Sequence, residues 1–168
     1  MKKQHRILQS LVVAGALAGV LGTAQAQTSF RFASEAPRAD TQYQAAVKMN
    51  EVLKAKTNGA LDLKIFTDSQ LGTFQAAIAG VRGGTIDMAV SGSGNFTGLE
   101  SMIGVFDSPY LFKDSEHAYK VLDGPTGMAI LAKLEPLGLK GLAFWDNGWR
   151  QMTNNRHPIT KPEDVKGL

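Results

Sequence analysis

The arginine at position 150 is the side chain whose type and setting most clearly predict binding chemistry. Residues 146–151 read Asp-Asn-Gly-Trp-Arg-Gln, so the guanidinium lies among aromatic and amide groups. A planar guanidinium can hold a carboxylate through two parallel hydrogen bonds. The same composition also allows a structural role for Arg150, either a salt bridge to Asp146 or stacking on Trp145 or Trp149. Position 150 is therefore a candidate carboxylate-binding site with a structural alternative.

A second candidate is the glycine-serine loop at residues 91–95, which reads Ser-Gly-Ser-Gly-Asn. Glycines after a strand let backbone N–H groups approach an anion, and the serines and Asn95 add polar groups. The loop lacks the GK[ST] ending of a phosphate-binding P-loop and the third glycine of a dinucleotide motif. A tight turn is therefore the main alternative to a ligand contact here.

Enzyme chemistry is not indicated. The three histidines lie in a basic leader (His5), on a polar helix face (His117) and beside a proline (His157), and the last two are typical of solvated surface imidazoles. The sequence has no HExxH, CxxC or GxSxG motif. Asp87 and Asp107 are better interpreted as capping or turn residues than as an acid/base pair. We therefore predict no catalytic residues, no metal site and no cofactor.

The N-terminus predicts a secretory signal peptide over residues 1–26. Lys2, Lys3 and Arg6 precede an apolar run at 11–21, and a small-x-small pattern ends at Ala26, the predicted cleavage point. A membrane anchor is the alternative, but the apolar run is well short of the roughly 20 residues that a spanning helix needs. The sequence contains no cysteine, which argues against a lipid anchor and against disulfides. A periplasmic location is expected.

The charge balance argues against an anionic macromolecular partner. Without Lys2, Lys3 and Arg6, the 18 basic residues become 15, which equals the 15 acidic residues. The mature chain is therefore formally neutral, and nucleic acid is not expected as a partner. The roughly 142 residues that remain can close one modest core, whereas a two-domain clamp normally requires about twice that length.

The pattern of apolar residues predicts an α/β fold. Period-two alternation favours strands at 29–34 and 61–66, and a mostly apolar run favours a third strand at 86–90. One helix is expected between the first two strands, capped by Asp40 or Thr41 and ended by Asn58-Gly59, and another over 73–81. Such a β-α-β-α-β run indicates parallel strands whose ligand lies beyond their carboxyl ends.

The remaining elements are less regular. Helices are expected at 113–122 and 125–137, and strands at 141–145 and 149–154. Residues 155–168 are polar and proline-punctuated, which predicts a connector into a further element. We therefore expect a first lobe over 27–154, followed by a connector into a second lobe that is largely missing.

Five short motifs in the same order resemble the solute-binding proteins of tripartite ATP-independent periplasmic (TRAP) transporters of the C4-dicarboxylate group. They are QLG at 70–72, GVRGGTIDM at 80–88, FDSPYLF at 106–112, NGWRQMTN at 147–154 and PEDVKGL at 162–168. The resemblance covers nearly all of residues 30–168. It implies a periplasmic-binding-protein-like fold, a mostly parallel sheet with flanking helices that forms one lobe of a two-lobed clamp.

The resemblance also implies a function. Such receptors close on an organic acid and deliver it to a membrane permease, and they commonly carry a strand-edge arginine at the position of Arg150. The family's other signature arginine lies just beyond the KGL motif that ends this sequence. Two departures bear on the ligand: Thr73-Phe74-Gln75 replaces an acidic turn, and the loop with Glu35 lacks a common histidine. The first departure predicts a more apolar or aromatic pocket wall, and both departures add aromatic carboxylates to C4-dicarboxylates as candidate ligands.

The prediction is a TRAP-type solute-binding receptor with a small-molecule carboxylate ligand, permease subunits as partners and no enzymatic activity. The predicted ligand-binding residues are Arg150 with the loop groups Glu35, Gln75 and Asn95, and Phe96 and Trp149 as hydrophobic walls. The alternatives are a small secreted α/β enzyme or adaptor that ends at Leu168, and a ligand-sensing module that acts on a membrane kinase.

Overall fold

The computed structural model describes residues 27–149 and 151–168, and these form two compact units. The first unit ends at Ser91 and the second runs from Gly92 to Leu168. The predicted signal peptide lies outside the described residues, as does Arg150. The lobe boundaries predicted above stay a prediction.

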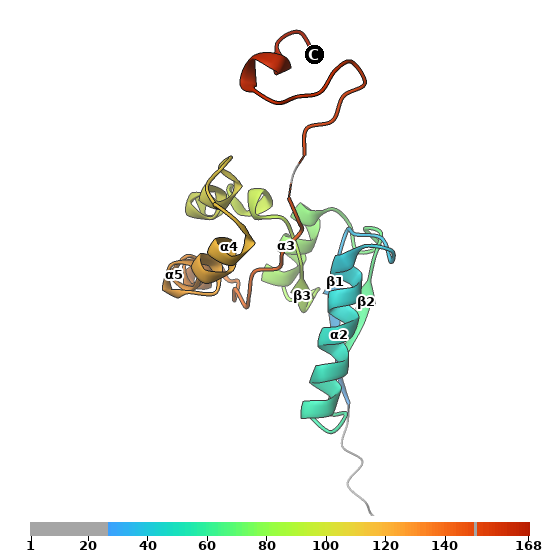
Figure 1. The fold of residues 1–168 in the computed structure, drawn as a ribbon. Helices are drawn as coiled ribbons and strands as arrows, with labels where there is room; N and C mark the ends of the chain where they lie inside the picture. Colours follow the sequence, from blue (N-terminus) through green and yellow to red (C-terminus); the bar gives the residue numbers. More distant parts are fainter. Residues whose placement is uncertain (1–26, 150) are drawn as a thin grey trace, which may run out of the picture. The chain divides into compact units, whose positions relative to one another are not determined.

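The first unit is a parallel sheet with helical crossovers (Figure 1). The strands are β1 (Thr28–Ala33), β2 (Leu61–Phe66) and β3 (Met88–Ala89), in the order β2-β1-β3. Thr28 lies opposite Leu61 and Ala33 opposite Phe66, while Phe32 and Ala33 face Met88 and Ala89 on the other side. Because parallel strands need crossover connections, α2 (Thr41–Lys56) and α3 (Phe74–Arg82) join them. The β-α-β-α-β prediction is confirmed.

Local sequence explains where the two helices begin and end. Asp40 accepts a hydrogen bond from the backbone N–H of Gln42 at 2.8 Å, which caps α2. Beyond the end of α2, Asn58 and Gly59 adopt positive φ angles of 50° and 78°. Thr73 caps α3 through the N–H of Ala76. The Asp40 cap and the Asn58-Gly59 end of α2 are those that the sequence predicts. The N-caps fix where α2 and α3 begin relative to the strands that precede them.

Buried side chains between the sheet and its helices hold the first unit together. Asn50 of α2 donates to the carbonyl of Leu63 and accepts from its N–H at 2.8 Å, so the helix is tied to β2 by polar bonds. The buried core consists of Phe32, Ala33, Ala46, Leu63, Ala77, Ile78 and Ile86. Burial of these apolar groups supplies the main driving force for the unit.

An ion pair fixes the turn before β3 to the central strand. The Asp87 carboxylate accepts from the backbone N–H of Arg31 at 2.7 Å and pairs with its Nε at 2.9 Å. The Arg31 guanidinium also donates to the carbonyl of Gly84 at 3.2 Å. The hydrogen bonds from Arg31 lower the pKa of Asp87 from its ordinary 3.8 to about 2. Asp87 is thus a structural residue of the fold, as the sequence suggests.

This lowered pKa predicts a specific acid sensitivity. Since the folded-state pKa lies below the ordinary value, the ionised carboxylate favours folding, and its contribution is fully present above about pH 4 and lost as the pH falls toward 2. Asp87→Asn should remove this component, so its melting temperature should fall less steeply between pH 4 and 2 than that of the unmodified protein. Thermal unfolding across this pH range tests it, and parallel curves for the two proteins would contradict it.

The second unit is built from short helices. They are η1 (Ser93–Phe96), η2 (Ser101–Asp107), α4 (Ser115–Leu122), α5 (Pro125–Ala132), η3 (Glu135–Leu137) and η4 (Pro162–Val165). Asp114 caps α4 by accepting from the N–H of His117 at 2.8 Å, and Pro125 opens α5. The buried apolar residues are Ile103, Ile130, Leu131, Leu134 and Leu139. The Phe106 ring packs edge-on against Phe144, with centroids 5.1 Å apart.

Three predictions for secondary structure need correction. The predicted strands at 141–145 and 149–154 do not form in the described part of this segment, which has no regular structure. A strand is stable only when a neighbour pairs with its backbone groups, and no described segment pairs with these residues. The helix predicted over 125–137 ends at Ala132, because Pro136 cannot continue it. The third strand pairs over two residues only.

Candidate functional site

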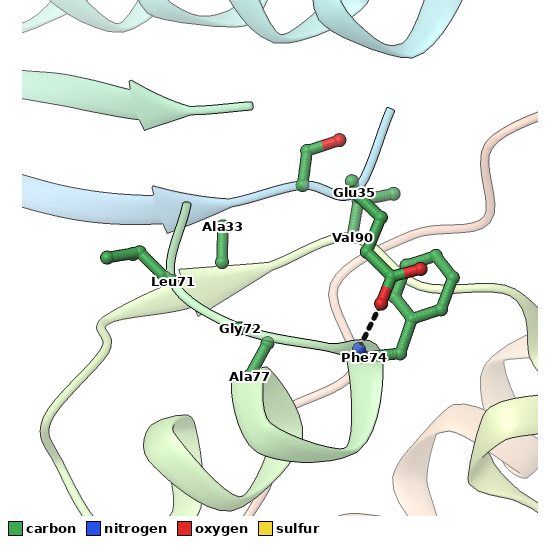
Figure 2. Close-up of a pocket in the computed structure, with 8 residues that line it drawn as sticks. Ala33, Glu35, Leu71, Gly72, Phe74, Ala77 and Val90 are labelled. Carbon is green, nitrogen blue, oxygen red and sulfur yellow. Dashed lines mark hydrogen bonds between the residues drawn. The ribbon is translucent and has the colours of Figure 1, made fainter. Parts of the chain in front are cut away.

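A shallow hollow lies at the carboxyl ends of β1 and β3, beside the first turn of α3 (Figure 2). Its empty space of about 190 Å³ includes the part open to solvent, so the enclosed volume is smaller still and well below the roughly 300 Å³ of a small ligand pocket. The hollow therefore accounts for only part of a binding site. Its lining residues are Ala33, Ser34, Glu35, Leu71, Gly72, Phe74, Ala77 and Val90.

Glu35 connects the loop after β1 to the start of α3. Its Oε1 atom accepts a hydrogen bond of 2.5 Å from the backbone N–H of Phe74, the first residue of the helix (Figure 2). A carboxylate is favoured at a helix N-terminus because the first N–H groups have no partner within the helix and carry partial positive charge. The bond fixes the carboxylate at the mouth of the hollow.

The loop that contains the QLG motif forms the opposite wall. Asp68 and Ser69 adopt positive φ angles of 54° and 57°, and Gly72 follows at 97°. A Cβ atom at Gly72 would lie 2.9 Å from the Cβ of Ala76, so this position requires glycine for both its backbone angle and its close contact. The turn directs Leu71 into the hollow's lining.

The chemistry of the hollow is simple. Of the eight described residues that line it, Glu35 alone is ionisable. Ala33, Leu71, Phe74, Ala77 and Val90 supply apolar surface, and the hydroxyl of Ser34 already accepts from the N–H of Ala36 at 3.1 Å. The hollow thus presents apolar surface beside one negatively charged hydrogen-bond acceptor.

The glycine-serine loop in the second unit is occupied by a carboxylate of the protein itself. Ser93 donates to Asp107 Oδ1 at 2.5 Å, and a Cβ atom built on Gly94 would lie 3.1 Å from Asp107 Oδ2. A second negative charge at this place would be repelled. The anion-binding interpretation of residues 91–95 is therefore disfavoured, whereas a neutral contact from Asn95 or Phe96 in η1 stays a prediction.

Trp149 lies in a segment that two side-chain hydrogen bonds attach to α4. Its indole Nε1 donates to Ser115 Oγ at 3.1 Å, and the Tyr119 hydroxyl donates to Asp146 at 2.6 Å. Asp146 also accepts from the backbone N–H of Gly148 at 2.6 Å. The hydrogen bond from Tyr119 is the largest cause of a lowered pKa for Asp146. Trp149 is 57% exposed and available for contact.

Of the predicted binding residues that the structure describes, only Glu35 lines the hollow. Gln75 is next to Phe74 in sequence but does not belong to the lining. Asn95, Phe96 and Trp149 belong to the second unit, and Arg150 lies outside the described residues. The sequence reasoning did not select Leu71, Phe74 or Val90, although the departure at Thr73-Phe74-Gln75 did indicate an aromatic wall. Their adjacency to the carboxyl ends of the strands was the available signal.

The described residues include neither a candidate metal site nor a candidate membrane span. Within 27–149 and 151–168, no three His, Cys, Asp or Glu residues are grouped so as to hold a metal ion. The same part of the chain has no helix with the length and apolar character needed to cross a membrane.

Comparison with known proteins identifies the relatives of this chain. Residues 32–168 match the family described as "Bacterial extracellular solute-binding protein, family 7". The chain is 49% identical to the 2,3-diketo-L-gulonate-binding periplasmic protein YiaO of Escherichia coli, over 99% of its own length and 50% of that protein. It is 38% identical to the C4-dicarboxylate-binding periplasmic protein of Rhodobacter capsulatus, over 98% and 50%.

A solved structure shows the same likeness in three dimensions. The sugar acid-binding protein of Advenella mimigardefordensis, in complex with galactonate, superposes with a TM-score of 0.77 at 32% identity. The match covers 85% of this chain and 46% of that one. The present chain thus spans about half the length of the relatives it matches.

Proposed function

Because the chain belongs to family 7 of the bacterial extracellular solute-binding proteins, we propose that it forms one lobe of a periplasmic receptor that captures an organic acid. The single observation that carries this proposal is the family match over residues 32–168. The hollow at the carboxyl ends of β1 and β3 supports it, because open α/β sheets bind ligands at this edge. The family consists of solute-binding receptors rather than enzymes.

A carboxylate is the group that the ligands named for the relatives share. YiaO is named for 2,3-diketo-L-gulonate, the Rhodobacter protein for C4-dicarboxylates, and the Advenella protein was solved with galactonate. We propose that Arg150 binds this carboxylate, and that Trp149, Asn95, Phe96 and Gln75 contribute further contacts. Glu35, which lines the hollow, would contact another part of the ligand.

The remaining half of such a receptor would supply the facing lobe. A two-lobed clamp binds by enclosing its ligand and excluding water, so each lobe alone offers an open, weak half-site. This agrees with the small size of the hollow in the first unit. Delivery of the bound acid to the membrane permease of a TRAP transporter completes the proposed role, and secretion through a signal peptide would place the receptor in the periplasm.

The proposal is tested by thermal unfolding of the full-length protein with a panel of acids. Galactonate, 2,3-diketo-L-gulonate, succinate and an aromatic acid, each at saturating concentration, are suitable probes. A ligand that binds only the folded state raises the melting temperature, by the equivalent of about 2.7 kcal/mol at one hundred times its dissociation constant. At least one acid should stabilise the protein, with a neutral sugar as the control. No response to any acid would contradict the proposal.

A further inference from the structure

We infer that Glu35 selects the ligand class: its carboxylate accepts a hydrogen bond from a ligand hydroxyl and rejects a second ligand carboxylate. On this inference, which rests on the proposed function, the receptor prefers hydroxylated monocarboxylates such as sugar acids to C4-dicarboxylates.

The charge of the hollow is negative. Glu35 is the only ionisable group among the eight described lining residues, and no ion pair joins it to a cation within the described chain. A ligand carboxylate placed here would face a like charge at short range, and the two would repel each other. The end of the ligand that enters the hollow should therefore be neutral.

One oxygen of Glu35 remains available for such a neutral group. Oε1 is engaged by the N–H of Phe74, whereas Oε2 has no hydrogen-bond partner among the described residues. An ionised carboxylate can only accept hydrogen bonds, so a ligand hydroxyl suits it and a ligand carboxylate does not. A hydroxyl that donates to a carboxylate makes a short, charge-assisted bond. The Oε2 atom thus favours a ligand hydroxyl and disfavours a ligand carboxylate.

The start of α3 would otherwise attract an anion, but at least three of its N–H groups already donate to acceptors of the protein. The N–H of Phe74 goes to Glu35, that of Ala76 to Thr73 Oγ1 at 3.4 Å, and that of Ala77 to the carbonyl of Thr73 at 2.8 Å. The Glu35 carboxylate also lies at the partially positive end of the helix, where an incoming anion would otherwise bind. An incoming carboxylate therefore finds neither these donors nor this charge free.

The apolar residues of the hollow suit the carbon skeleton of a hydroxylated ligand. Phe74, Leu71 and Val90 offer surface for its C–H groups, while Glu35 accepts a hydrogen bond from one hydroxyl. Succinate has no hydroxyl to donate, and its two carboxylates leave no neutral end. The hollow therefore discriminates by ligand charge and by hydrogen bonding at once.

Three acids separate these two effects in the full-length protein. Galactonate has hydroxyls and one carboxylate, galactarate has the same chain of hydroxyls with a second carboxylate, and succinate has two carboxylates without hydroxyls. Isothermal titration of the unmodified protein should show galactonate binding at least tenfold more tightly than either diacid. Tighter binding of succinate than of galactonate would overturn the inference.

The variant Glu35→Gln removes the charge and keeps a carbonyl acceptor for the Phe74 N–H. It should weaken galactonate binding about tenfold and leave succinate and galactarate binding unchanged or stronger, so that the preference is lost. Equally weaker binding of all three acids would indicate a purely structural role of Glu35 through α3. Unchanged galactonate binding would show that Glu35 accepts no hydrogen bond from a ligand hydroxyl. Either result overturns the inference.

Glu100→Gln is the matched control. Glu100 Oε1 accepts from the backbone N–H of Met102 at 2.9 Å at the start of η2, so it is also a carboxylate on a helix start. It does not line the hollow, and its variant should retain the preference for galactonate. If the unmodified protein binds none of the acids in the wider panel, the proposed function itself fails, and that outcome is distinct from binding without the predicted preference.

Discussion

Replacing Arg150 with lysine is expected to weaken binding of the preferred organic acid about a hundredfold in the full-length protein. Hydrogen bonds to charged groups contribute about 1.5–3 kcal/mol each, and lysine cannot reproduce the planar pair of bonds that a guanidinium makes with a carboxylate. Alanine should be worse than lysine, because it leaves the ligand carboxylate enclosed without a counter-charge. Titration calorimetry of the three proteins with one acid tests this order.

The control must be an arginine close in sequence that serves the fold instead. Arg156 donates through Nη1 to the carbonyl of Gly167 at 2.5 Å, and this bond lies in the connector over residues 155–168. Arg156→Lys should therefore leave affinity within about twofold. If Arg150→Lys behaves like Arg156→Lys, or if Arg150→Ala lowers the melting temperature without changing affinity, the structural alternative for Arg150 is correct.

The second large effect is expected on stability, from Gly127→Ala in α5. A Cβ atom at Gly127 would lie 1.9 Å from the carbonyl oxygen of Leu122, the last residue of α4, and 2.6 Å from its carbonyl carbon. The obstacle is backbone, which cannot rotate away as a side chain could. Overpacking of this kind costs about 1–3 kcal/mol, and the short connection at Asp123-Gly124 leaves little room to separate the helices.

Thermal and urea unfolding of the variant check this prediction, and its melting temperature should fall by several degrees. Gly98→Ala is the matched control, because no atom lies within 4 Å of a Cβ built there. Its unfolding should match that of the unmodified protein to within about 0.5 kcal/mol. Equal stability of the Gly127 and Gly98 variants would show that α4 and α5 can move apart freely.

The elements that the sequence predicts well are those that carry local signals. The first crossover helix has Asp40 before it and Asn58-Gly59 after it, and the structure places α2 at Thr41–Lys56 between them. The first two strands alternate with period two and have the predicted positions within one residue. Periodicity and capping act within a few residues of one another, so a single sequence reveals them.

The failures concern interactions between distant residues. Residues 141–145 form a short apolar run that is typical of a buried strand, but a strand also needs a neighbour to pair with, and the run itself does not reveal one. The bond between Asp107 and Ser93 closes the glycine-serine loop against anions, and nothing local in the sequence indicates it. Phe74 was predicted only as part of an apolar or aromatic pocket wall at residues 73–75, and its place beside the ends of β1 and β3 is what makes it line the hollow.

The order β2-β1-β3 has a consequence for how the first unit folds. Its central strand pairs with residues 33 positions later in β2 and 56 positions later in β3, as Thr28 with Leu61 and Phe32 with Met88 show. Non-local pairing of this kind requires the chain to lose the entropy of loop closure before the stabilising contacts form, so such chains fold slowly. During synthesis, the central strand cannot acquire both neighbours until Ala89 has emerged from the ribosome. The sheet of the first unit therefore cannot close until the whole span from Thr28 to Ala89 is available for pairing.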